Sequence, residues 1–208
     1  MNAPEYLMLI LAYFLGSIPI GLLVARIFYH RDIRKEGSGN IGATNALRQF
    51  GTKVGVFVLI MDMMKGVGAV LLARHFWGLA HPLVSVCGLL VILGHVFSIW
   101  LKFKGGKGVA TAAGVFAALA PMSLIIAVLV FILVVVRSRY VSLGSILAAV
   151  VFAICTYLME LLSPKPDWGL LILTALIVLM IVFRHIENIK RLVKGEENKI
   201  SFSKRGRS

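Results

Sequence analysis

Long apolar segments dominate this chain and leave only short polar stretches between them. Hydrophobic residues make up 59% of its 208 residues, more than the core of a soluble domain of this size would hide. Apolar runs of this length are typical of helices that cross a bilayer. The sequence therefore predicts an all-α integral membrane protein with seven transmembrane helices, at residues 4–28, 54–74, 83–101, 109–120, 122–136, 143–162 and 168–183.

The basic residues predict the orientation of these helices. No Lys or Arg precedes the first span, and a basic cluster follows it, so the positive-inside rule places the N-terminus outside. Seven crossings then make four segments cytoplasmic, namely residues 29–53, 102–108, 137–142 and 184–208. These segments hold five, three, two and eight of the 22 basic residues. We expect a single domain over residues 1–208 that ends in a basic cytoplasmic tail, residues 189–208.

The segment 109–136 allows two interpretations. It could form one tilted helix, or two short helices folded at Pro121. One helix would place residues 137–208 outside, together with their many basic residues, against the positive-inside rule. We therefore expect two short helices here, sheltered from lipid by their neighbours.

Three short polar segments, each at the end of an apolar span, carry most of the chemistry. They are residues 37–45 (GSGNIGATN), 102–108 (KFKGGKG) and 184–188 (RHIEN). Glycines let a backbone approach a ligand closely, while Lys, Arg, Asn and Ser supply donors with little negative charge. This composition suits an oxyanion, so we expect a phosphate site at the membrane surface.

Several other functions fit these segments poorly. Gly37, Gly39 and Gly42 match the dinucleotide pattern G-x-G-x-x-G, but a membrane helix precedes them instead of a strand. The lysines and glycines of residues 104–108 lack the spacing of an ATP-binding loop. The net charge of +13 comes without a zinc-finger or RNA-binding signature. We expect no cofactor, no metal and no nucleic-acid partner.

In the first polar segment, Ser38, Asn40, Thr44 and Asn45 offer donors, and Arg48 follows on a short amphipathic stretch. A guanidinium can bind two phosphate oxygens at once. A tight turn with helix-capping side chains would explain the same residues equally well. The segment alone therefore leaves both interpretations open.

The second polar segment could form a flexible anion-binding loop. A helix is expected to start directly after it, at residue 109, and would direct free N–H groups at a bound anion. The charge on the inner connection at residues 137–145 has a similar ambiguity, because two arginines and three serines reach the same face. Basic loops that merely follow the positive-inside rule would explain both segments.

The third polar segment places His185 and Asn188 on one helical face. A histidine at this position is more often structural, but its proximity to two anion loops favours a functional role. Within the second span, Asp62 and Lys65 would each cost about 2.5–3.5 kcal/mol if they faced lipid at the bilayer centre. We expect them to face inward as a bracing ion pair, with a proton relay as the alternative; His95 is similarly ambiguous.

Taken together, GSGNIGATN with Arg48, KFKGGKG and RHIEN resemble the three signature motifs of the bacterial acyl-phosphate-dependent glycerol-3-phosphate acyltransferases, the PlsY family. The resemblance covers essentially the whole chain. It implies a multi-pass enzyme of the bacterial inner membrane, with short helices packed around an active site that faces the cytoplasm. The reaction it implies transfers a fatty acyl group from acyl phosphate to the sn-1 hydroxyl of glycerol 3-phosphate. The products are lysophosphatidic acid and inorganic phosphate, in the first committed step of phospholipid biosynthesis.

The resemblance also implies the site residues. The catalytic residues would be Ser38, Arg48, Lys107, Ser145, His185 and Asn188. The substrate-binding residues would be Gly37, Gly39, Asn40, Thr44, Asn45, Lys104, Gly105, Gly106, Gly108, Arg139, Ser142 and Glu187. Membrane lipid is a further expected partner, and an upstream enzyme that forms acyl phosphate is a candidate partner.

Acyl phosphate is an activated anhydride, so no covalent acyl-enzyme is required. We expect the glycerol hydroxyl to attack directly, with its proton taken by a substrate phosphate or by His185. The alternative function is a membrane transporter or exchanger of phosphate or small organophosphates, which would use the same basic loops. The absence of a sequence repeat and the gathering of polar segments on one side argue against it.

Overall fold

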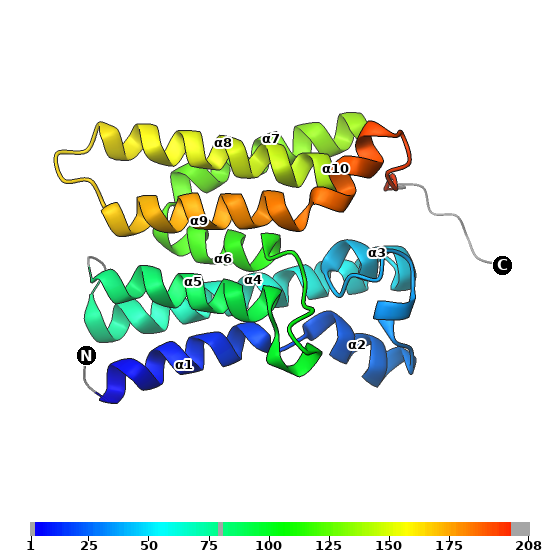
Figure 1. Ribbon diagram of the computed structural model, residues 1–208, viewed down its shortest axis with the longest axis horizontal. Helices are drawn as coiled ribbons and strands as arrows, with labels where there is room; N and C mark the ends of the chain where they lie inside the picture. Colours follow the sequence, from blue (N-terminus) through cyan, green and yellow to red (C-terminus); the bar gives the residue numbers. More distant parts are fainter. Residues whose placement is uncertain (1–2, 79–80, 201–208) are drawn as a thin grey trace.

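The computed structural model describes residues 3–78 and 81–200, which form helices that run along one long axis (Figure 1). The elements are α1 (Ala3–Ser17), α2 (Ile20–Tyr29), η1 (Ile33–Lys35), α3 (Ala43–Phe50), α4 (Thr52–Trp77), α5 (Pro82–Val96), η2 (Ile99–Leu101), α6 (Val109–Leu119), α7 (Pro121–Ser138), α8 (Val141–Leu161), α9 (Trp168–Arg184) and α10 (Ile186–Val193). The all-helical prediction is confirmed for this part of the chain.

Within residues 3–78 and 81–200, four segments are long and apolar enough to cross a membrane alone, namely Thr52–Trp77, Pro82–Leu101, Pro121–Ser138 and Val141–Leu161. Two bent pairs reach that length together, α1 with α2 and α9 with α10, with bends of 46° and 52°. The apolar α6 is shorter, at 11 residues. Each predicted span therefore corresponds to a helix or a bent pair, whereas the number of crossings stays a prediction.

The expected first span is interrupted between α1 and α2. Pro19 lies at this break and cannot donate a backbone hydrogen bond. Side chains from other elements satisfy the carbonyls left free. The Ser98 hydroxyl donates to the Ser17 carbonyl at 2.6 Å, and Lys65 Nζ donates to the carbonyls of Gly16 and Ile18 at 3.1 and 3.0 Å. The break is therefore fixed by polar contacts to the core.

The segment 109–136 forms two helices, α6 and α7, which confirms the preferred interpretation. Only α6 is both short and sheltered, because it packs against α4. The 18 residues of α7 expose large apolar side chains, such as Leu129 and Leu133 at 62% and 70%. The expectation of two short sheltered helices was wrong for α7, which is long enough to face lipid along its length.

Glycines let two pairs of helices approach closely. A Cβ at Gly66 of α4 would overlap the Thr111 carbonyl of α6, and a Cβ at Gly114 would overlap the carbonyl of Met63. Between α1 and α5, a Cβ at Gly16 would likewise overlap the backbone carbonyl of Val91 in α5. Small residues at such crossings allow the backbone contacts that hold membrane helices together. The core beside them is made mainly of apolar side chains from α4, α5, α6 and α9, with smaller contributions from α1, α7 and α8.

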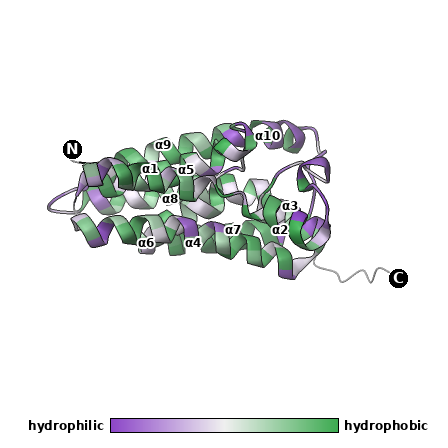
Figure 2. Ribbon diagram, turned by 90° about the horizontal axis from the view of Figure 1, so that it is seen from below, coloured by the Kyte–Doolittle hydropathy of each residue, from purple (hydrophilic) through white to green (hydrophobic). Residues whose placement is uncertain are grey.

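The polar segments gather at one end of the bundle. The α2–α3 region, the α7–α8 turn and α10 lie at the end away from the N-terminus, and the loop before α6 lies between that end and the middle of the bundle (Figure 1). Hydrophobic residues fill the middle of the helices and hydrophilic ones mark their ends (Figure 2). The described residues of the four segments predicted to be cytoplasmic therefore lie toward the same end of the bundle.

Candidate active site

A cavity of about 160 Å³ opens at this polar end. All six predicted catalytic residues line it, although they come from segments far apart in the sequence. The predicted substrate-binding residues that also line it are Asn40, Thr44, Asn45, Gly108 and Ser142. Those that do not line it are Gly37, Gly39, Lys104, Gly105, Gly106, Arg139 and Glu187.

Asn45 ties together the loop that leads into α3. Its Nδ2 donates to the carbonyls of Ile33, Glu36 and Asn40 at 3.2, 3.0 and 2.8 Å. Its Oδ1 accepts from the Ser38 backbone N–H at 3.1 Å. Because the buried amide is fully used in this way, Asn45 shapes the loop and has no donor left for a ligand.

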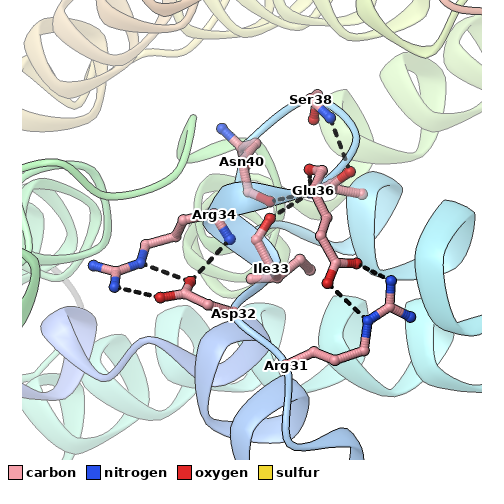
Figure 3. Close-up of polar contacts among 8 residues, drawn as sticks. Arg31, Asp32, Ile33, Arg34, Glu36, Ser38 and Asn40 are labelled. Atoms are coloured by element: carbon pink, nitrogen blue, oxygen red, sulfur yellow. Dashed lines mark hydrogen bonds and ion pairs between the residues drawn. The ribbon is translucent and has the colours of Figure 1, made fainter.

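Surface ion pairs and two glycines complete this loop. Asp32 accepts from the Arg34 guanidinium at 2.9 and 2.6 Å, and Glu36 accepts from Arg31 at 2.7 Å (Figure 3). Gly37 and Gly39 have φ values of 55° and 70°, a left-handed conformation that favours glycine. These glycines serve the turn, which presents Ser38 to the cavity.

The glycines of the second polar segment also serve the backbone. The N–H groups of Gly105 and Gly106 donate to the carbonyls of Val96 and His95 at 3.0 and 3.1 Å. Arg184 Nη2 lies 3.3 Å from the carbonyls of both glycines. Their N–H groups are therefore used by α5 and do not form the anion-binding loop expected from the sequence.

What this segment brings to the cavity is Lys107 and the start of α6. Lys107 is half-buried, and its Nζ donates to Asn188 Oδ1. Burial lowers the pKa of Lys107 to about 8, opposed by the Glu197 carboxylate and assisted by nearby arginines. The cavity is also lined at the N-terminus of α6 by residues 108–110. Backbone N–H groups at this point lack partners within the helix. The exposed Lys104 lies outside.

Glu197, which the sequence did not single out, is a buried acid in the cavity wall. Its Oε1 accepts from Asn188 Nδ2 at 2.7 Å and from the Ser142 hydroxyl at 2.9 Å. Its Oε2 accepts from Arg191 Nε at 2.7 Å. Burial alone would raise the pKa of Glu197, but these hydrogen bonds outweigh it and lower the pKa. Glu197 is therefore held as a carboxylate.

The tail that carries Glu197 folds back across the polar end. Asn198 accepts through its carbonyl from Arg48 Nη2 at 2.9 Å, and the Ile200 N–H donates to the Arg139 carbonyl at 2.8 Å. Of the expected basic tail, residues 189–193 belong to α10 and residues 194–200 form this strap. Residues 201–208 lie outside the described part of the chain.

Two more predicted residues have defined hydrogen bonds. His185, 2% exposed, has its Nδ1 2.8 Å from the Ile181 carbonyl. A carbonyl can only accept, so Nδ1 carries the hydrogen and Nε2 of the neutral ring is an acceptor. Ser145 donates its hydroxyl to the Val141 carbonyl at 2.9 Å. Glu187, by contrast, is exposed and pairs with Lys190.

Apolar and ionisable side chains form the rest of the wall. Leu59, Phe131 and Val141 also line the cavity and can contact an apolar group beside the polar donors. Asp62 and His95 line the wall as well, and Asp62 Oδ1 lies 2.8 Å from Lys65 Nζ in the predicted inward-facing ion pair. Among the described residues, no group of three or more His, Cys, Asp or Glu could hold a metal ion.

The sequence profile of the family described as "Glycerol-3-phosphate acyltransferase" matches residues 6–195. The chain belongs to this glycerol-3-phosphate acyltransferase family. It is 46% identical to glycerol-3-phosphate acyltransferase 2 of Bacillus anthracis, over 93% of this chain and 98% of that protein. It is 51% identical to the glycerol-3-phosphate acyltransferase of Trichlorobacter lovleyi, over 90% and 93%.

Solved structures of the family agree with the fold. The crystal structure of PlsY (YgiH), an integral membrane glycerol 3-phosphate acyltransferase, in its glycerol 3-phosphate form matches 96% of both chains with a TM-score of 0.89 and 36% identity. Its lysophosphatidic acid form matches the same shares with a TM-score of 0.86 and 35% identity. Membership of the glycerol-3-phosphate acyltransferase family confirms the resemblance seen in the sequence motifs and argues against the transporter alternative.

Proposed function

We propose that this acyltransferase moves a fatty acyl group from acyl phosphate to the sn-1 hydroxyl of glycerol 3-phosphate and releases lysophosphatidic acid and inorganic phosphate. The observation that carries the proposal is the meeting of three distant polar segments at one cavity that also has an apolar wall. Both substrates carry phosphate, one is water-soluble, and the other has a chain that requires apolar surroundings. A cavity with these two kinds of wall suits both.

Arg48 and Lys107 are the cations best placed to bind the phosphates. Arg48 uses one Nη for the strap carbonyl, and its buried Nε has no hydrogen-bond partner within the described residues. A buried guanidinium N–H without a partner is costly and is readily satisfied by an anion. The free N–H groups at the start of α6 add to the positive field at the same cavity.

The reaction we propose is a direct displacement. The glycerol hydroxyl oxygen bonds to the acyl carbon, the bond from that carbon to the phosphate oxygen breaks, and the leaving phosphate takes the hydroxyl proton. Ser142 and Ser145 are poorly prepared as nucleophiles, because they donate to Glu197 and Val141 instead of to a histidine base. His185 has Nε2 as an acceptor and is the alternative base.

We further propose that the N-terminus lies outside the bacterial inner membrane and the cavity on the cytoplasmic side, with seven crossings. The shared position of the basic segments supports this orientation. In a variant without Cys87 and Cys155, Lys104→Cys would resist a membrane-impermeant maleimide in intact cells. Lys165→Cys, exposed between α8 and α9, would be labelled. The reverse pattern would contradict the orientation.

The donor is tested by offering purified protein and glycerol 3-phosphate three acyl donors in turn, palmitoyl phosphate, palmitoyl-CoA and an acylated carrier protein. We expect lysophosphatidate only from palmitoyl phosphate, because Arg48 and Lys107 line the cavity and suit the charge of a phosphate leaving group. Equal product from palmitoyl-CoA would show that another donor is used. An enzyme that makes acyl phosphate would then no longer be an expected partner.

A further inference from the structure

Three buried ionisable side chains beside the cavity have no part in the mechanism proposed above. Asp62, Lys65 and His95 are 2%, 5% and 4% exposed, and Asp62 and His95 line the cavity. Ionisable side chains in membrane-spanning helices are expensive and commonly functional. Their hydrogen bonds show what this group could do.

Lys65 is surrounded by acceptors. Its Nζ donates to the carbonyls of Gly16 and Ile18 at 3.1 and 3.0 Å and lies 2.8 Å from Asp62 Oδ1. The two carbonyls take two of the hydrogens on Nζ, and the ion pair with Asp62 favours the charged form of the amine. Asp62 Oδ1 has no hydrogen-bond partner among the described residues, so the third hydrogen is left for His95 Nδ1. Lys65 is therefore an ammonium.

The position of Lys65 determines where His95 carries its proton. His95 Nδ1 lies 3.1 Å from the same Nζ and 3.6 Å from Asp62 Oδ1, too far to donate to that carboxylate. A hydrogen on Nδ1 would face the hydrogens of the ammonium. Nδ1 thus directs its lone pair at Lys65, and the neutral ring carries its hydrogen on Nε2.

The Nε2 end of the ring faces the second polar segment. A Cβ added at Gly106 would overlap His95 Nε2, and the Gly106 N–H donates to the His95 carbonyl at 3.1 Å. No hydrogen bond between described residues uses Nε2. His95 is itself a lining residue, so this N–H lies beside the cavity and close to the loop of Lys107, without an acceptor among the described residues.

We propose that His95 is a further catalytic residue, which donates its Nε2–H to the acyl carbonyl oxygen as that oxygen becomes negative. Lys65 and Asp62 are positioning residues that keep the ring in this tautomer. The proposal rests on the acyl transfer proposed above. A neutral donor suits a carbonyl oxygen, whereas Arg48 and Lys107 supply the charges that phosphate needs. Leu59, which precedes Asp62 by one turn of α4, also lines the cavity and places this end near the acyl chain.

Two amide variants of His95 separate its proposed catalytic role at Nε2 from its contact with Lys65 at Nδ1. His95→Gln places an N–H near the position of Nε2, whereas His95→Asn keeps a polar partner near Nδ1. We expect His95→Asn to lower kcat by about 10²–10³, as loss of an oxyanion donor does elsewhere. The kcat of His95→Gln should be at least about tenfold higher than that of His95→Asn. The KM for glycerol 3-phosphate should change little in both variants, because residue 95 does not contact the phosphate of that substrate in the proposed mechanism. The opposite order, or wild-type kcat in His95→Asn, would overturn the proposal.

A measurement on the unaltered protein covers the case in which a variant does not fold. Nitrogen-15 NMR of histidine-labelled protein in detergent reports which ring nitrogen of His95 carries the hydrogen, with the signals assigned through the bonds of the side chain. We expect the hydrogen on Nε2. A hydrogen on Nδ1 would overturn the proposal whatever the variants do.

A coupling experiment tests the positioning role of Lys65. If Lys65→Met acts through His95, it should lower kcat in the wild-type background and have little further effect in His95→Asn. Independent losses would contradict the positioning role. Failure of the proposed function would look different, because the wild-type protein would then make no lysophosphatidate from acyl phosphate.

Discussion

Asn188 Nδ2 donates to Glu197 Oε1 at 2.7 Å, while the carbonyl oxygen of the same amide accepts from Lys107. One side chain thus links the buried acid of the tail to a cation of the cavity. Because its Oδ1 and its Nδ2 both make hydrogen bonds, Asn188 orients Lys107 and Glu197 in this structure. The protonation of Lys107 therefore depends on Glu197.

The first prediction concerns the charge of Glu197. Burial lowers the pKa of Lys107 to about 8, and the Glu197 carboxylate opposes this shift by favouring the charged amine. Glu197→Gln removes that charge, so the pKa of Lys107 should fall further and the alkaline decline of kcat/KM should move to lower pH. Glu196→Gln is the matched control, since Glu196 is exposed and adjacent. An unshifted decline in Glu197→Gln would contradict the coupling.

The second prediction concerns Lys107 itself. In the free wild-type enzyme the ammonium is lost as pH rises through about 8, so kcat/KM should fall across that range. Lys107→Arg keeps a cation that does not deprotonate in proteins. The variant should have a lower kcat/KM overall, because its geometry differs, but no decline near that pH. A decline that persists in Lys107→Arg would assign it to another group.

The third prediction concerns the loop held by Asn45. Asn45→Ala would leave three carbonyls and one N–H of the loop without their partner. Each buried polar group left unsatisfied costs about 1–3 kcal/mol. We expect a clear drop in the unfolding temperature in detergent, together with loss of activity. An unchanged unfolding temperature would mean that the loop holds its shape without this amide.

The fourth prediction compares two glycines of α4. Gly66→Ala should destabilise the protein, because a Cβ there would overlap the Thr111 carbonyl of α6. At Gly68 no heavy atom lies within 4 Å of an added Cβ, and alanine favours helix over glycine. Gly68→Ala should therefore be neutral or slightly stabilising. Equal thermal unfolding of the two variants would contradict the close α4–α6 crossing.

Much of this architecture could be predicted from local sequence. Apolar length fixes where helices lie, and the basic residues group the loops that meet at one end. The helix break at Pro19 was harder to predict, because the backbone carbonyls of residues 16–18 accept hydrogen bonds from Lys65 and Ser98, which lie in distant parts of the chain. Proline alone does not reveal whether such partners exist.

The sequence predicted those site residues whose side-chain chemistry alone suggests a function. Arg48, Lys107 and His185 were expected and do meet at the cavity. Glu197 was missed because its importance comes from a hydrogen bond to Ser142, 55 residues away, which only the folded tail creates. Gly106 was expected to contact substrate, but its N–H bonds to α5, a role that composition does not distinguish from anion binding.

The most direct measurement follows both products of a single reaction. Purified protein is mixed with palmitoyl phosphate and labelled glycerol 3-phosphate, and lysophosphatidate and inorganic phosphate are measured together. We expect equal amounts of the two products. Arg48→Ala and Lys107→Ala should each slow both by about 10²–10³, the cost of about 2.7–4 kcal/mol for losing one such donor. Wild-type rates in either variant, or phosphate release without lysophosphatidate, would contradict the account.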